Sequence, residues 1–284
     1  SAILWAARPC AAGCKPFWKA TRTKARQKGG EEMKLKGKVA VITGGGTGIG
    51  RAAAIALAAE GARVVVMARR PEPLNETVDI IKEAGGEGLA IPSDVTVIED
   101  IEKARDKVRE TYGRLDILVN NAGSALFKPF MKTSLEDFDR IYQVDLRSVF
   151  AVSQLMLPLM LEGGGGSIIN ISSILGVLGG KSSSAYCAMK GGVVQLTRAL
   201  AAELGPEIRV NCLCPSHIIT PMMEDELSRI ETKGKMDKLT KMFPMKRLAY
   251  PEDMTGSILF YASDDSKWLT GNILMIDGGL SCYI

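Results

Sequence analysis

The stretch KVAVITGGGTGIG, residues 38–50, decides the fold of this chain. It begins with a short Val/Ile-rich run, which is typical of a strand buried on both faces. A cluster of glycines follows, and the residues up to Gly61 then carry Ala and Leu at helical spacing. A glycine-rich turn between a strand and a helix lets backbone N–H groups approach a pyrophosphate. The stretch therefore predicts dinucleotide binding, although Gly44-x-x-x-Gly48-x-Gly50 is not the G-x-G-x-x-G spacing and a structural turn stays open.

Outward from this stretch, strand and helix patterns alternate to the end of the chain. Apolar runs predict strands at 38–43, 63–68, 88–94, 115–121, 166–173, 208–215 and 272–279. Helical spacing predicts helices at about 48–61, 72–84, 98–112, 134–161, 184–204 and 251–262. Such alternation is typical of an α/β fold, a Rossmann-type doubly wound parallel sheet of about seven strands with helices on both faces. No linker divides residues 33–284, so we expect a single domain there.

Charge is unevenly distributed along the chain. The 284 residues carry a net charge of +4, but residues 1–32 hold seven basic and only two acidic side chains. The remaining 252 residues are close to neutral, so the body of the protein gives no charge argument for nucleic acid. We interpret residues 1–32 as a basic N-terminal extension without a function of its own, and a transit peptide stays open. No apolar run reaches the roughly 18–20 residues of a membrane span.

The six cysteines show no spacing typical of a metal site. Cys212 and Cys214 alternate along a predicted strand and so share one face. Reduced, mostly buried thiols indicate a reducing compartment, and we expect a cytoplasmic protein without a metal ion. His217 is the only histidine, and no nucleophile motif surrounds it.

The second predicted strand ends in the sequence VVVMARR, residues 64–70. In dinucleotide folds an acid near this point binds the ribose 2′-hydroxyl, whereas an arginine accommodates a 2′-phosphate. Ala68 occupies the expected place of the acid, and Arg69 follows it. A guanidinium binds phosphate through two parallel hydrogen bonds. The pattern favours NADP over NAD, with a solvated arginine pair as the alternative.

The stretch SAYCAMKGG, residues 184–192, places a tyrosine four residues before a lysine. Tyr186 and Lys190 lie on one helical face at this spacing. A free tyrosine has a pKa near about 10, too high for efficient proton transfer at neutral pH, and a neighbouring ammonium lowers it. Taken alone, the pair is equally typical of a half-exposed helix face.

Seven motifs in this order give the chain a resemblance to the short-chain dehydrogenase/reductase family, in its main branch, which includes 3-oxoacyl-carrier reductases and carbonyl reductases. They are TGGGTGIG (43–50), SDV (93–95), NNAG (120–123), NISS (170–173), YCAMK (186–190), RVNCLCP (209–215) and DGG (277–279). The resemblance covers about residues 36–280. It implies that Tyr186 exchanges a proton with the substrate, that Lys190 lowers the tyrosine pKa, and that Ser173 holds the substrate oxygen, with Ser172 as a less well spaced alternative.

The resemblance also implies a cofactor site. Lys190 would hold the nicotinamide ribose, Asp94 would contact adenine, Asn121 and Gly123 would lie beside the adenine ribose, and positions 218 and 220 would lie near the carboxamide. The expected cofactor-binding residues are Gly44, Thr47, Gly48, Ile49, Gly50, Arg69, Asp94, Val95, Asn121, Ala122, Gly123, Tyr186, Lys190, Pro215, Ile218 and Thr220.

Two positions depart from the family pattern. Asp145, in VDLRSVF (144–150), stands where relatives carry an asparagine that holds a water of the proton relay. An ionised carboxylate only accepts hydrogen bonds, and its burial is costly unless it is paired. We include Asp145 among the catalytic residues, with an altered pH profile and a tolerated substitution both open. Ser216 replaces a glycine, so His217 either faces the substrate or is structural.

We predict an NADP-dependent oxidoreductase acting on a small apolar carbonyl or secondary alcohol. Methionines and one phenylalanine give the expected substrate loop, 221–247, an adaptable apolar character; they are Met222, Met223, Met236, Met242, Phe243 and Met245. A 3-oxoacyl-thioester reductase, with Arg147, Arg198 or Lys246 at the pocket mouth, and a non-catalytic NADP-binding sensor are the alternatives. The resemblance further implies a homodimer or homotetramer.

Overall fold

Seven parallel strands form one sheet in the computed structural model, which describes residues 33–221, 223 and 238–282. The strands are β1 (Val39–Thr43), β2 (Arg63–Ala68), β3 (Glu87–Pro92), β4 (Ile117–Asn120), β5 (Gly166–Ile171), β6 (Ile208–Pro215) and β7 (Ile273–Ile276). Their order in the sheet is β3-β2-β1-β4-β5-β6-β7, as in a Rossmann-type doubly wound fold. The predicted extension, 1–32, lies outside the described residues.

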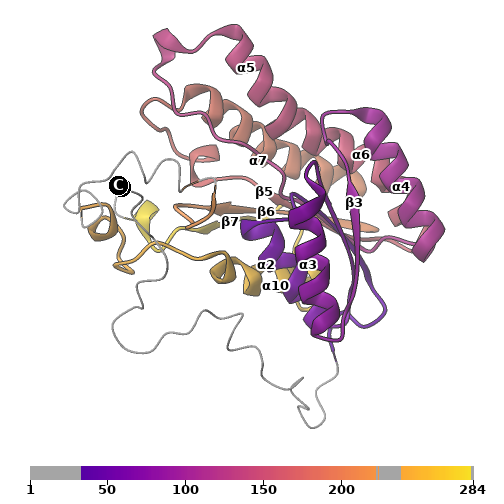
Figure 1. Ribbon diagram of the computed structural model, residues 1–284. Helices are drawn as coiled ribbons and strands as arrows, with labels where there is room; N and C mark the ends of the chain where they lie inside the picture. Colours follow the sequence, from indigo (N-terminus) through magenta and orange to yellow (C-terminus); the bar gives the residue numbers. More distant parts are fainter. Residues whose placement is uncertain (1–32, 222, 224–237, 283–284) are drawn as a thin grey trace, which may run out of the picture. The chain divides into compact units, whose positions relative to one another are not determined.

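Helices cover both faces of this sheet (Figure 1). One face packs against α2 (Gly48–Ala59), α3 (Pro71–Glu83) and α10 (Thr255–Ala262). The other packs against α4 (Ile98–Tyr112), α6 (Ser148–Glu162) and α7 (Ser184–Leu204). Neighbouring residues of a strand supply opposite faces, as Val41 and Ile42 of β1 do. Burial on both faces explains why the strands read as continuous Val/Ile runs.

The chain order reverses at β1, because β2 lies on one side of it and β4 on the other. In open parallel sheets, ligands bind beyond the carboxyl ends of the strands at such a reversal. The glycines that follow β1 and the residues that follow β4 lie at this point. The topology therefore positions the predicted cofactor motifs together.

The helix predicted at 134–161 has three parts: α5 (Leu135–Tyr142), a π turn η2 (Gln143–Arg147), and α6. A π turn adds one residue to a helical turn and occurs frequently at functional sites. Here the turn contains Asp145, whose side chain is fully buried. The prediction of an uninterrupted helix is wrong, because helical spacing does not register a single inserted residue.

The composite helix Leu135–Glu162 is the one stretch within the described residues that is long and apolar enough to cross a membrane by length and composition. Half of its most apolar window is buried inside the protein. Most buried apolar residues of α6 belong to the apolar cluster that the sheet forms with α4, α6 and α7. The core helix of a soluble protein has the same properties.

Other boundaries follow the predictions closely, and the ends of α4, α7 and β6 match them. The predicted last strand is shorter because Gly278 and Gly279 have positive φ, 62° and 84°. The predicted helix at 251–262 divides into a 3-10 turn η4 (Pro251–Met254) and α10. Two further 3-10 turns, η1 (Phe130–Lys132) and η3 (Ile174–Gly176), flank the site described below.

Candidate active site

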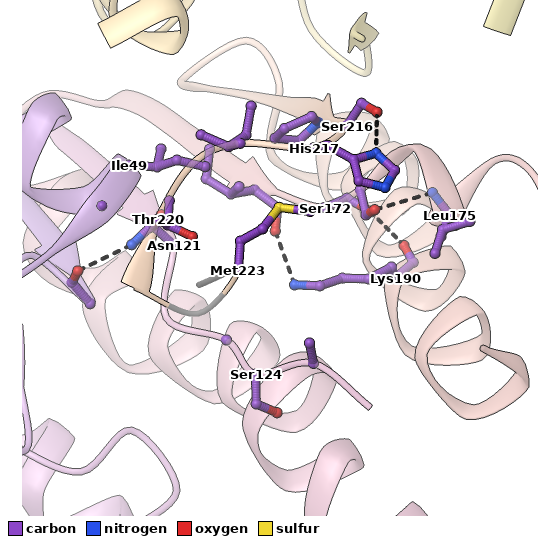
Figure 2. Close-up of a pocket in the computed structure, with 18 of the residues that line it drawn as sticks. Ile49, Asn121, Ser124, Ser172, Leu175, Lys190, Ser216, His217, Thr220 and Met223 are labelled. Atoms are coloured by element: carbon purple, nitrogen blue, oxygen red, sulfur yellow. Dashed lines mark hydrogen bonds between the residues drawn. The ribbon is translucent and has the colours of Figure 1, made fainter. Parts of the chain in front are cut away.

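A cavity of about 330 Å³ opens at the carboxyl ends of β1, β4, β5 and β6. Figure 2 shows Ile49, Asn121 and Thr220 at one end of it and Leu175 and His217 at the other. Most of the predicted cofactor residues line this cavity: Gly44, Thr47, Gly48, Ile49, Asn121, Ala122, Gly123, Tyr186, Lys190, Pro215, Ile218 and Thr220. The predicted catalytic residues Ser173, Tyr186 and Lys190 line it as well.

The turn after β1 requires glycine for two separate reasons. Gly44 and Gly48 have positive φ, 66° and 54°, which side chains disfavour. Gly50 is needed for close approach, because a Cβ there would lie 2.3 Å from the Gly44 carbonyl oxygen. The turn therefore presents bare backbone at the start of α2, which fits a pyrophosphate group.

Three side chains that the sequence analysis missed fix this turn. The Thr43 hydroxyl accepts hydrogen bonds from the backbone N–H groups of Asn121 and Ala122, both at 3.0 Å. Arg51 donates to the Gly46 carbonyl at 2.8 Å, and Thr77 donates to the Gly45 carbonyl at 3.1 Å. Thr43 and Arg51 flank the glycine motif, which is the only sequence signal for them.

The predicted adenosine-side residues surround the turn outside the cavity lining. Arg69 is exposed, two residues beyond Met67, whose carbonyl accepts hydrogen bonds from the Gly44 and Gly45 N–H groups. Within the described part of the chain, Arg69 has no hydrogen bond or ion pair, so its guanidinium can take a ligand. Asp94 accepts bonds from the backbone and hydroxyl of Thr96, at 2.9 and 2.8 Å. Val95 is buried in the core beneath, and Gly50 lies inside the turn.

α7 presents Tyr186 and Lys190 to the cavity from successive turns. The Lys190 Nζ lies 5.7 Å from the centroid of the Tyr186 ring, and the centroid of the Phe127 ring lies 5.8 Å from it. The Ser173 hydroxyl accepts a bond from the backbone of Leu175 at 3.2 Å and acts to lower the pKa of Tyr186. The three predicted catalytic side chains are thus brought together.

The two adjacent serines have different partners. The Ser172 hydroxyl donates to the Lys190 backbone carbonyl at 2.8 Å, which ties β5 to α7. Ser173 acts to lower the pKa of Tyr186, and both serines line the cavity. The choice of Ser173 for contact with a substrate stays a prediction.

Asp145 forms a buried ion pair with Lys190, with Oδ1 3.1 Å from Nζ. Lys190 also donates to the Ile171 carbonyl at 3.3 Å. Asp145 additionally accepts bonds from Ser124, from its backbone N–H at 3.0 Å and from its hydroxyl at 2.7 Å. Ser124 was missed by the sequence analysis, since nothing in its neighbourhood marks it as a partner of a residue 21 positions away.

Several groups act on the pKa of Tyr186. Burial makes the largest contribution and raises this pKa, the Lys190 ammonium lowers it, and the Asp145 carboxylate raises it, so the net shift is upward. Burial acts to lower the pKa of Lys190, but Asp145 and Tyr186 raise it above its ordinary value. Lys190 thus acts on Tyr186 in the predicted direction, and a lowered pKa with the oxidised nicotinamide bound stays a prediction.

The remaining wall of the cavity comes from the segment after β6. The His217 ring stacks edge-on against Phe243 at 5.6 Å, and its Nδ1 lies 3.1 Å from the Ser216 hydroxyl. Burial lowers the pKa of His217, which keeps the imidazole neutral at neutral pH. The Thr220 side chain covers Gly48, since a Cβ on that glycine would lie 3.1 Å from its methyl group. His217 lines the cavity while its ring packs on Phe243, so contact with a substrate stays a prediction.

Only part of the predicted methionine-rich loop, 221–247, lies within the described residues. Met222 and Met236 lie outside the described residues. Met223 lines the cavity, and Phe243 is buried in a small apolar cluster beside it. Met242 and Met245 are exposed. Within the described ranges, no group of three or more His, Cys, Asp or Glu side chains could hold a metal ion.

Comparisons with known proteins identify the family of this chain. The profile of a family described as enoyl-(acyl carrier protein) reductase matches residues 44–281. The chain is 39% identical over 252 residues to the 3-oxoacyl-[acyl-carrier-protein] reductase FabG of Thermotoga maritima, which covers 87% of this chain and 99% of that protein.

Two solved structures share the fold. One is a 7α-hydroxysteroid dehydrogenase in complex with NADH and 7-oxo glycochenodeoxycholic acid, with a TM-score of 0.82, 36% identity and coverage of 87% of this chain and 96% of that one. The other, from Beutenbergia cavernae and described as an NAD(P)-dependent gluconate 5-dehydrogenase, has NADP bound; its TM-score is 0.82 at 35% identity, covering 89% of this chain and 100% of that one. The chain therefore belongs to the short-chain dehydrogenase/reductase family and is an NAD(P)-dependent oxidoreductase.

Proposed function

We propose that this enzyme uses NADP(H) to interconvert a small apolar carbonyl compound and its secondary alcohol. The observation that carries the proposal is the convergence of Ser173, Tyr186 and Lys190 on one cavity that also holds the glycine turn. A proton donor, an oxygen-binding hydroxyl and a cation within one apolar-walled cavity suit charge development on a carbonyl oxygen.

When bound, a reduced nicotinamide supplies the hydrogen and the two electrons that the carbonyl carbon receives. The Ser173 hydroxyl donates a hydrogen bond to the carbonyl oxygen and orients it toward Tyr186. As negative charge develops on that oxygen, the Tyr186 O–H bond breaks and its proton forms the alcohol O–H. The phenolate left on Tyr186 lies beside the Lys190 ammonium and regains a proton from solvent. Alcohol oxidation follows the reverse path.

Four groups of residues would hold the cofactor. The backbone of the glycine turn would bind the pyrophosphate, and Asp94, Val95 and the segment 121–123 would surround the adenosine. Lys190 has three N–H donors and uses two of them on Asp145 and Ile171, which leaves one for a ribose hydroxyl. Pro215, Ile218 and Thr220 would enclose the nicotinamide.

The choice of NADP rests on Arg69 and on the absence of an acid at the end of β2. Ala68 ends this strand, and the free guanidinium of Arg69 follows it. Relatives bind either form, since one solved structure holds NADP and another NADH. An exposed arginine that has no partner in the described part of the chain favours the cofactor with the extra phosphate.

The same site could reduce a 3-oxoacyl thioester, and the identity to the Thermotoga maritima enzyme supports this second candidate. The basic residues predicted for a carrier arm do not line the cavity. Arg147 donates to the Thr96 carbonyl, Arg198 is bonded to Gln195, and Lys246 is bonded to the Lys241 carbonyl. Small apolar carbonyls are therefore preferred.

Free cysteines at positions 187, 212, 214 and 282 support a reducing location such as the cytoplasm.

The test is the rate of NADPH oxidation, with NADH in parallel, against apolar ketones and an acetoacetyl thioester. We expect turnover with NADPH and an apolar ketone, and a loss of at least about a hundredfold in Tyr186→Phe, because general acid catalysis contributes about 10²–10⁴-fold. NADPH binding by this variant, followed by fluorescence, is the control for folding. Saturable NADPH binding without turnover of any substrate would contradict the proposal and support the sensor alternative.

A further inference from the structure

We propose that Asp145 is a positioning residue that pairs with Lys190 and thereby withholds part of its positive charge from Tyr186, so that proton transfer operates at more alkaline pH than with an amide at position 145. This inference rests on the proposed function for its catalytic consequence. The electrostatic part concerns only this chain and can be measured without turnover.

Both side chains of the pair are buried, although Lys190 also lines the cavity. The Asp145 side chain is fully buried, and that of Lys190 is 5% exposed. Gly123 covers both, since a Cβ there would lie 3.0 Å from Asp145 Oδ1 and 3.3 Å from Lys190 Nζ. In this low-dielectric setting, a charge 3.1 Å away acts far more strongly than it would at the surface.

The hydrogen bonds identify the charged form of Asp145. Its oxygens receive three kinds of donor: the Lys190 ammonium, the Ser124 N–H and the Ser124 hydroxyl. A carboxylate that accepts several donors is held in its ionised state. A family asparagine at this position would offer one oxygen and two N–H donors and no charge. The pair as a whole is therefore neutral, whereas an amide partner would leave the ammonium unopposed.

Few other titratable groups face this pair. α7 contributes Tyr186 and Cys187, and β6 contributes Cys212 and Cys214. The π turn contributes Asp145 itself, while β5 and the segment after β4 contribute only the Ile171 carbonyl and Ser124. Within the described residues, Asp145 is the one carboxylate among the groups that act on Lys190 and Tyr186.

The charges of Lys190 and Asp145 act on the pKa of Tyr186 in opposite directions. A cation near a phenol favours the phenolate and lowers the pKa of the phenol, and an adjacent anion cancels part of that effect. Burial and Asp145 raise the pKa of Tyr186 while Lys190 lowers it, with a net shift upward. Alcohol oxidation, which needs the phenolate, should therefore rise toward alkaline pH. Carbonyl reduction, which needs the phenol, should persist to higher pH.

The experiment measures the ionisation of Tyr186 in the enzyme without cofactor, by NMR of protein labelled at the tyrosine ζ-carbon. The chain has six tyrosines, and Tyr186→Phe identifies the resonance. We expect Tyr186 to stay protonated beyond about pH 10, the ordinary tyrosine value. In Asp145→Asn we expect its titration midpoint to fall by about one pH unit or more. The pH profile of alcohol oxidation should move in the same direction.

Two control variants separate the effect of the Asp145 charge from the effect of a changed hydrogen bond or a distant charge. Ser124→Ala removes one hydrogen bond to Asp145 but keeps its charge, and Asp139→Asn removes an exposed charge from α5. Both should leave the Tyr186 midpoint near that of the wild type. An unchanged or higher midpoint in Asp145→Asn, or an equal shift in Ser124→Ala, would overturn the proposal. If Asp145→Asn does not fold, a wild-type midpoint below about 10 would overturn it as well.

The NMR result is independent of catalysis. A shifted Tyr186 midpoint together with an absence of turnover would contradict the proposed function and leave the electrostatic role of Asp145 supported. Turnover with an unshifted midpoint would support the proposed function and contradict this inference.

Discussion

Arg69 is the residue on which the choice between NADP and NAD depends. Its guanidinium is exposed and has no partner among the described residues, next to a strand end that lacks an acid. We expect Arg69→Ala to raise the KM for NADPH about tenfold while that for NADH stays unchanged, because a hydrogen bond to a charged group contributes about 1.5–3 kcal/mol and solvent screens part of it. Initial rates at varied cofactor concentration give both constants.

Arg70 provides a matched control for this prediction. It is the next residue, is also exposed, and has no hydrogen bond or ion pair with any described residue; it precedes the first residue of α3. Arg70→Ala should change the two KM values equally or not at all. If Arg70→Ala raises the KM for NADPH as much as Arg69→Ala does, the effect belongs to the general positive charge of this segment and not to a specific phosphate contact.

Among individual residues, the sequence identifies candidate site residues where a motif has a fixed spacing. Ser173, Tyr186 and Lys190 could be predicted because their types and intervals are constrained by the chemistry they share. The partner of Lys190 could not be predicted in the same way. Asp145 meets Lys190 through tertiary packing across 45 positions of the chain, and Ser124 in turn donates hydrogen bonds to Asp145.

The glycine turn between β1 and α2 is the element with the strictest steric requirement. A Cβ at Gly50 would lie 2.3 Å from a backbone oxygen, so the turn would have to move. Forced backbone shifts of this kind cost about 1–3 kcal/mol, or roughly five- to a hundredfold in affinity. We expect Gly50→Ala to weaken NADPH binding by that factor, measured by fluorescence titration, with circular dichroism showing that the fold is kept.

Gly256→Ala is the control for this element. Gly256 lies in α10, and a Cβ there would meet no atom within 4 Å. The substitution should stabilise the protein by about 0.4–1 kcal/mol, because alanine restricts the unfolded chain. Its NADPH affinity should equal that of the wild type. Equal loss of affinity in both variants would mean that the close approach at Gly50 is not what limits binding.

Regular elements were predictable to within about two residues because both faces of the sheet are buried, which makes periodicity a strong signal. The π turn at Gln143–Arg147 was not, since a single extra residue leaves the helical pattern on either side intact. Yet this turn carries Asp145 into the protein interior. The element that the sequence describes least well is therefore the one that modifies the proton-transfer group.

At the scale of the whole molecule, the site lies where the strand order reverses. Residues that follow β1, β4, β5 and β6 meet there. That arrangement uses one side of α6 for the core and leaves large apolar side chains of α5 and α6 exposed. Leu135, Phe150 and Leu161 are 78%, 48% and 46% exposed. Large apolar side chains clustered on a helical face indicate an interface. We therefore expect self-association through α6, consistent with the predicted homodimer or homotetramer.

Phe150→Glu tests this interface. In a two-fold interface each substitution occurs twice, and a central aromatic residue typically contributes about 2 kcal/mol or more. We expect the dissociation constant to rise by on the order of a hundredfold or more, seen as a shift to smaller species in sedimentation velocity at varied concentration. Lys36→Glu, an exposed charge reversal outside α5 and α6, should leave the association state unchanged. A wild-type monomer at micromolar concentration, or an unaltered oligomer in Phe150→Glu, would show that the apolar face of α6 is not where copies of this chain meet.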